Sequence, residues 1–93
     1  MGRPLNETVW MLNSNVLRKL GMQDLMVFVA VYQHGNLTDV ADALSVSQST
    51  ASYCLKKLRS SFADELFITT RGGMQATPRA ADMYPHVLQI IDS

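Results

Sequence analysis

Residues 36–62 constrain the fold of this chain most, because two helical patterns there are separated by a short polar break. In the first pattern Asn36 stands three residues before Asp39, a spacing at which each side chain can cap a backbone N–H group of the first helical turn. Ser45-Val46-Ser47 then forms the break: Val46 is expected to fill the core between the helices, and Ser47 to cap the second helix. The stretch is therefore a helix-turn-helix signature.

The second helix of this motif separates an apolar face from a polar face. At 100° per residue the apolar residues fall on one side, namely Ala51, Cys54, Leu55, Leu58 and Phe62. The opposite side carries Ser49, Ser52, Tyr53, Lys56 and Ser60. No Asp or Glu occurs between Asp42 and Asp64. A phosphate-facing surface must lack carboxylates, so this pattern favours contact with DNA over a merely solvated helix.

Composition limits the chain to one small module. Its 93 residues are 47% hydrophobic, enough for one modest core, and the formal net charge of zero does not itself point to nucleic acid. The single cysteine excludes an internal disulfide and a cysteine-only metal site. Neither a signal peptide nor a membrane span is recognisable, so we expect a cytoplasmic protein.

The residues before the motif predict one core helix and a less regular extension. A helix is expected over residues 22–34, apolar nearly all round and therefore well buried, with Gly35 as a left-handed cap. Residues 1–20 carry an apolar stripe that the poor helix formers of residues 13–15 interrupt. This extension is expected to be one imperfect helix or two short pieces. A dimer-stabilising arm and a loosely packed extension remain equally open.

The residues after the motif predict a hairpin and a further helix. Residues 66–70 have strand propensity, residues 71–73 supply a turn, and residues 74–77 can pair back, which gives a small β-hairpin wing. Thr77 and Pro78 then start a helix whose apolar face is wider than one small domain needs, which suggests a partner helix.

With these elements in order, the chain resembles the N-terminal DNA-binding domain of LysR-type transcriptional regulators over about residues 22–93. The matching pieces are Asp24-Leu25 with Phe28, Leu37-Thr38 with Ala41 and Leu44, Val46-Ser47-Gln48-Ser49, Leu55-Lys56-Lys57-Leu58-Arg59, Asp64-Glu65-Leu66-Phe67 and Thr77-Pro78. The Asp64-Glu65-Leu66-Phe67 run and Arg79 look most similar to the LeuO-like and NodD-like branch. The chain departs from the family pattern at Ser49, commonly proline, and at Tyr53 and Thr69, commonly basic.

The resemblance implies a mainly α winged helix-turn-helix with a small β-hairpin wing and a trailing linker helix through which two copies dimerise. It divides the chain into an N-terminal extension (1–20), the winged helix-turn-helix (21–77) and the start of the linker helix (78–93). A small-molecule effector would act only through a C-terminal domain absent from this sequence, and the missing cap at residue 93 favours a fragment of a longer protein.

The implied function is sequence-specific binding of double-stranded DNA by a homodimer on an inverted-repeat operator, with residues 47–62 as the recognition helix in the major groove. The expected DNA contacts are Thr38, Gln48, Ser49, Ser52, Tyr53, Lys56 and Arg71. In the plainer interpretation Gln48 and the serines only cap the helix, and Arg71 is a solvated turn residue.

Two other function classes were compared with this one. The neutral charge and the departures at Tyr53 and Thr69 leave room for a winged-helix protein-interaction module without DNA binding. An enzyme is the weakest class, because His34, His86 and Cys54 lie on separate elements and no catalytic motif occurs. No metal or cofactor is implied, and the expected location is the cytoplasm, in association with the nucleoid.

Overall fold

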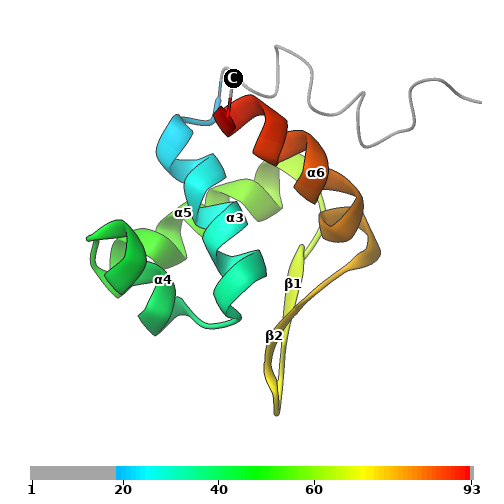
Figure 1. Cartoon of the computed structure of the whole chain (residues 1–93). Coiled ribbons are helices and arrows are strands. Elements are labelled where there is room, and N and C mark those ends of the chain that lie inside the picture. Colours follow the sequence, from blue (N-terminus) through cyan, green and yellow to red (C-terminus); the bar gives the residue numbers. More distant parts are fainter. Residues whose placement is uncertain (1–18, 93) are drawn as a thin grey trace, which may run out of the picture.

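Four helices and one hairpin make up residues 19–92, the part of the chain that the computed structural model describes (Figure 1). Their bounds are α3 Met22–His34, α4 Leu37–Leu44, α5 Gln48–Phe62, β1 Phe67–Thr70, β2 Gly73–Ala76 and α6 Pro78–Asp92. Most of the predicted N-terminal extension, residues 1–18, lies outside the described residues. The mainly α winged helix-turn-helix architecture is confirmed, and the hairpin projects away from the helices (Figure 1).

The caps predicted for Asn36 and Ser47 are confirmed, whereas the Asp39 carboxylate bonds the Asn36 side chain and not a backbone N–H group. The backbone N–H of Asp39 donates to Asn36 Oδ1 at 2.8 Å, and Asn36 Nδ2 donates to Asp39 Oδ2 at 2.9 Å. Ser47 Oγ accepts the N–H of Thr50 at 3.0 Å, so α5 begins where the sequence predicts. Each bond satisfies a backbone group or side chain that the first helical turn would otherwise leave without a partner.

The core lies where α3 meets α5, β1 and α6. Its largest fully buried side chains include Phe28, Leu58, Phe62, Phe67 and Met83. The predicted apolar face of α5 is confirmed, since all five of its residues are buried. The prediction that α3 is well buried is confirmed only in part: Val27, Phe28 and Val31 are among its buried residues, whereas Met22, Met26 and Tyr32 are exposed. Three helical neighbours and the wing cover only part of its circumference.

Helix α6 is held against α3 by its own side chains. The Tyr84 ring stacks on the Tyr32 ring with centroids 3.9 Å apart, and Gln33 Nε2 donates to the Tyr84 hydroxyl at 2.8 Å. Ala80, Met83 and Val87 are buried against the core, and Ile90 and Ile91 pack on its edge. Part of the wide apolar face predicted for this helix therefore packs against the core of the same chain and not against a partner helix.

The wing is an antiparallel pair in which Phe67 lies opposite Ala76 and Thr70 lies opposite Gly73. The predicted hairpin is confirmed, with three boundary differences, the first of which is that Thr77, expected to pair back, lies beyond the end of β2 at Ala76. Leu66 is not part of the first strand, because its φ of 65° is left-handed and incompatible with extended backbone. Gly73, expected in the turn, is the first residue of β2.

Gly73 occupies a position that only glycine fits. Its φ is 115°, and a Cβ atom there would lie 2.9 Å from the Gly35 carbonyl oxygen. This closeness follows from a hydrogen bond next to it, in which the Met74 N–H donates to the Gly35 oxygen at 2.8 Å. The start of β2, next to the hairpin turn, is thereby attached to the corner between α3 and α4.

Gly73→Ala is expected to lower the free energy of unfolding by about 1–3 kcal/mol, because the new Cβ strains the backbone and pushes against the Gly35 carbonyl. The matched control is Gly72→Ala, where the nearest atom would lie 4.0 Å from the Cβ and φ is not positive. Urea unfolding of both variants measures the difference. Equal stability of the two would contradict this account of the wing.

The C-terminus of α5 stores strain at Ala63. This exposed residue caps the helix with φ 51° and ψ 45°, a left-handed conformation that costs an L-residue about 1 kcal/mol. Ala63→Gly is expected to raise the free energy of unfolding by about 0.5–1 kcal/mol. Ser60→Gly, at an exposed position inside the same helix, is expected to lower it by a similar amount. Thermal melts of both variants test the opposite signs.

Candidate nucleic-acid interface

The exposed face of α5 gathers five of the seven predicted contact residues into one place. An open hollow of about 500 Å³ is lined by Leu37, Gln48, Ser49, Ser52, Tyr53 and Lys56. The polar residues come from the first three turns of α5, and Leu37 comes from the first turn of α4. The hollow therefore presents amide, hydroxyl, phenol and ammonium groups side by side, without a carboxylate among its lining residues.

The other two predicted residues lie on different elements. Thr38 is exposed in the first turn of α4, next to Leu37 of the hollow, where backbone N–H groups at a helix N-terminus can receive a phosphate. Arg71 is exposed at the tip of the hairpin, between β1 and β2. Neither residue lines the hollow, so the candidate interface has three parts: α5, the start of α4 and the wing tip.

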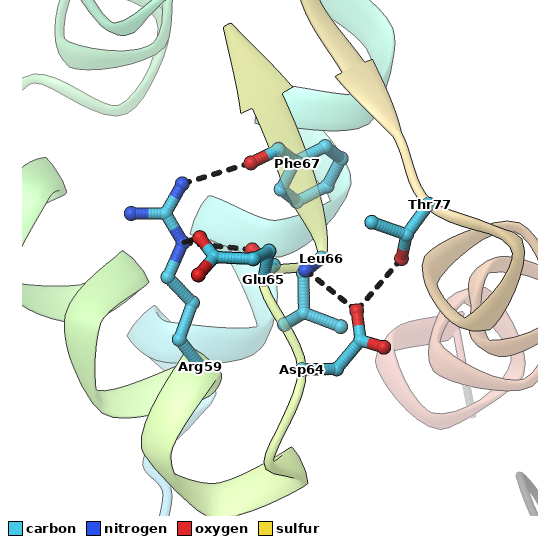
Figure 2. A network of polar contacts seen from close by, with 6 residues as sticks. All are labelled: Arg59, Asp64, Glu65, Leu66, Phe67 and Thr77. Carbon is cyan, nitrogen blue, oxygen red and sulfur yellow. Dashed lines mark hydrogen bonds and ion pairs between the residues drawn. The ribbon is translucent and has the colours of Figure 1, made fainter.

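The three cations of α5 have three different surroundings. Lys56 lines the hollow. Lys57 Nζ lies 3.0 Å from the buried Asp24 Oδ2. Arg59 Nε donates to the Glu65 carbonyl at 2.7 Å, and Arg59 Nη2 donates to the Phe67 carbonyl at 2.9 Å (Figure 2). Only Lys56 of the three is thus directed to the candidate interface.

Asp24 and Lys57 form an ion pair that ties α3 to α5. Burial acts to raise the pKa of Asp24, but hydrogen bonds from the Gly21 N–H and from Lys57 outweigh it and lower the pKa below 3.8. The hydrogen bond to Asp24 raises the pKa of Lys57. Both partners are therefore charged at neutral pH.

The one cysteine, Cys54, lies next to this ion pair. Burial is the main cause that raises the pKa of its thiol to about 11, and the neighbouring Asp24 carboxylate adds to the effect. The thiol is therefore protonated and unreactive.

A second carboxylate, Asp64, joins the two ends of the wing. Its Oδ1 atom accepts the Leu66 N–H at 2.8 Å and the Thr77 hydroxyl at 2.8 Å, as Figure 2 shows. The Thr77 N–H in turn donates to the Leu66 carbonyl at 2.9 Å, and Thr77 Oγ1 accepts the Ala80 N–H to cap α6. This network fixes where the hairpin leaves the helices.

The residues that hold the interface in place were not identified from the sequence. In the sequence, Asp24 and Asp64 stand out only as parts of the motifs that carry the resemblance. One available signal was the position of Asp24 in the first turn of its helix, where it caps the Gly21 N–H at 2.8 Å. The pairing of Asp24 with Lys57, 33 positions away, has no local signal.

Residues 19–92 carry neither a metal-binding cluster nor a membrane-spanning helix. No cluster of three or more His, Cys, Asp or Glu side chains is arranged to hold a metal ion there. None of the described helices is long and apolar enough to cross a membrane.

A helix-turn-helix followed by a hairpin wing defines the winged helix-turn-helix class, and the second helix of the motif here has an exposed face without carboxylates. Residues 22–81 match the family model described as bacterial regulatory helix-turn-helix protein, lysR family. The chain belongs to this family, and its winged helix-turn-helix is the DNA-binding domain of a LysR-type transcriptional regulator.

Individual relatives agree with this assignment. The chain is 37% identical over 75 residues to the HTH-type transcriptional regulator LeuO of Escherichia coli, covering 81% of this chain and 24% of LeuO. It is 31% identical over 77 residues to the uncharacterized regulator YbdO of the same species, covering 83% of this chain and 26% of YbdO. These relatives are transcriptional regulators. The chain spans about a quarter of their length.

Solved structures show the same fold. The probable transcriptional regulator PA0477 from Pseudomonas aeruginosa has a TM-score of 0.77 and 36% identity, covering 83% of this chain and 26% of that chain. BenM_DBD, in its complex with benA site 1 DNA, has a TM-score of 0.72 and 22% identity, covering 78% of this chain and 82% of that chain. At 22% identity this second likeness concerns the fold alone.

Proposed function

We propose that this chain binds a specific inverted-repeat operator as a homodimer, with α5 in the major groove. The observation that supports this most directly is the hollow on α5, where Gln48, Ser49, Ser52, Tyr53 and Lys56 lie together on an exposed face. These side chains supply the donors and acceptors that read base edges. The N-cap of α5 is Ser47, whose Oγ accepts the Thr50 N–H, so capping of this helix does not account for the five side chains.

Each residue of the interface has a definite role in this proposal. The Gln48 amide pairs with an adenine edge, Ser49, Ser52 and Tyr53 meet neighbouring edges, and Lys56 neutralises a phosphate. Thr38 donates to a second phosphate at the start of α4, and Arg71 reaches the backbone or the minor groove from the wing. Two copies joined through α6 would bring two recognition helices to two half-sites. A cytoplasmic, nucleoid-associated location follows from this role.

A fluorescence anisotropy titration tests the proposal. The probe is a duplex selected from a random-sequence pool by the chain itself, and the affinity is measured across a range of salt concentrations. The logarithm of the association constant is expected to fall linearly with the logarithm of salt concentration, with two copies bound per duplex. The alternative, a protein-interaction module, predicts no measurable affinity for any duplex even at low salt.

Lys56→Ala is expected to reduce the salt slope by about 0.9 for each copy bound, because one phosphate contact is lost per copy. Lys19→Ala removes the same charge from an exposed position outside the three-part interface and serves as the control. Both slopes come from the same titration series. Equal slopes for the two variants would remove Lys56 from the proposed interface.

A further inference from the structure

Tyr53 is exposed but is not without support. Its side chain lines the hollow and is 61% exposed, and the Lys57 Nζ atom lies 5.1 Å from the centroid of its ring. The two residues are four positions apart on α5, a spacing that places them on one face of the helix. An ammonium group over an aromatic face is attracted by the ring quadrupole. Lys57 therefore restrains a ring that solvent exposure alone would leave mobile.

Lys57 is itself held in place by the buried carboxylate of Asp24. Its ammonium lies 3.0 Å from Oδ2 of Asp24, a side chain only 2% exposed, and the same oxygen accepts the Gly21 N–H at 2.8 Å. The other oxygen, Oδ1, is buried without a hydrogen-bond partner among the described residues. A buried carboxylate is tolerated only with a counter-ion. If Lys57 moved to a DNA phosphate, Asp24 would lose that counter-ion. Lys57 therefore stays against the face of the Tyr53 ring.

We propose that Lys57 is a positioning residue for Tyr53: held by Asp24, it fixes the ring at the wall of the hollow and so sets the preference for the base pair that Tyr53 meets. This inference rests on the proposed function, in which Tyr53 faces base edges. A ring held in one orientation presents its hydroxyl and its edge at one place. A ring that samples several rotamers loses conformational entropy when it is ordered on binding, and it can contact more than one kind of base pair.

The inference is tested with the selected duplex and with versions in which each base pair is changed singly. The main variant combines Asp24→Asn with Lys57→Gln, which removes both charges together and leaves no buried charge unpaired. The rescue variant is Lys57→Arg, which keeps a cation both at Asp24 and at the ring. Urea unfolding and circular dichroism establish that each variant is folded.

Discrimination is the ratio of the affinity for the selected duplex to the affinity for a duplex with one changed base pair. In the neutral double variant this ratio is expected to fall about two- to fivefold at the base pairs where Tyr53→Ala also lowers it. Lys57→Arg is expected to retain it. The salt slope is expected to stay unchanged, since Lys57 touches no phosphate. In a Tyr53→Ala background the same two substitutions are expected to add nothing, because the residue through which Lys57 acts is gone.

Two results would overturn the inference. A loss that persists in the Tyr53→Ala background with a reduced salt slope would make Lys57 a phosphate contact. A uniform loss at all base pairs, with lower stability and no rescue by Lys57→Arg, would leave it a purely structural residue. Both results leave the proposed function standing. Failure of the unsubstituted chain to bind any duplex at low salt would reject the proposed function and this inference with it.

Discussion

The double variant Gln48→Ala with Lys56→Ala is expected to bind the selected duplex more weakly than the unsubstituted chain, by about 100-fold for each copy bound. Gln48 is in the first turn of α5 and Lys56 is two turns further on, and both line the hollow. A bidentate contact to a base is worth about 1–3 kcal/mol, and a phosphate contact adds a smaller, salt-dependent contribution. The two losses together correspond to this factor.

The two substitutions are expected to act differently when separated. Gln48→Ala should weaken binding to the selected duplex more than binding to random duplex, whereas Lys56→Ala should weaken both alike. Ser60→Ala, at an exposed position of α5 outside the hollow, is the control. Anisotropy titrations at one fixed salt concentration measure the four variants and the unsubstituted chain. If Ser60→Ala matched the double variant, the hollow would not be the contact surface.

Asp64→Ala is expected to lower the free energy of unfolding by about 2–4 kcal/mol. The substitution leaves two donors without their acceptor, the Leu66 N–H and the Thr77 hydroxyl, each bonded at 2.8 Å in the intact chain. Leu66 is fully buried, so its N–H cannot form a replacement hydrogen bond with water. An unsatisfied buried donor costs about 1–3 kcal/mol.

The neighbouring residue provides the matched control for this prediction. Glu65 is 75% exposed, and its carboxylate lies 3.7 Å from Arg59 Nε, an exposed contact of small value. Glu65→Ala is therefore expected to change the free energy of unfolding by less than about 0.5 kcal/mol. Urea unfolding of both variants tests the contrast between adjacent carboxylates. A similar loss for both would show that the charge of this segment, and not the Asp64 network, supports the wing.

Local features of this fold could be predicted from the sequence because their causes are local. Asn36 with Asp39, Ser47 with Thr50, and Thr77 with Ala80 are each three residues apart, so a cap there requires only the first turn of a helix. The inward and outward faces of α5 likewise follow from a single helical period. These features sufficed to predict the motif and the side of α5 that is exposed.

The supports of the interface could not be predicted, because they join residues far apart in the chain. Lys56 and Lys57 are adjacent and chemically alike, yet one lines the hollow and the other pairs with Asp24 of another helix. The rotation of α5 against α3 decides which lysine meets the carboxylate. Leu66 is a similar case: its strand propensity is high, and its left-handed backbone follows from the Asp64 and Thr77 contacts around it.

The hydrogen bond from Met74 to Gly35 has a consequence for the shape of the DNA that this domain accepts. It attaches the wing to the corner from which α4 begins, so Arg71 at the wing tip and Thr38 at the start of α4 keep a set separation. In the proposed interface, a duplex whose backbone does not match that separation would have to bend or change its groove width to meet both residues. The energy of such a deformation depends on base sequence. Selectivity is therefore expected to extend to base pairs that no side chain touches.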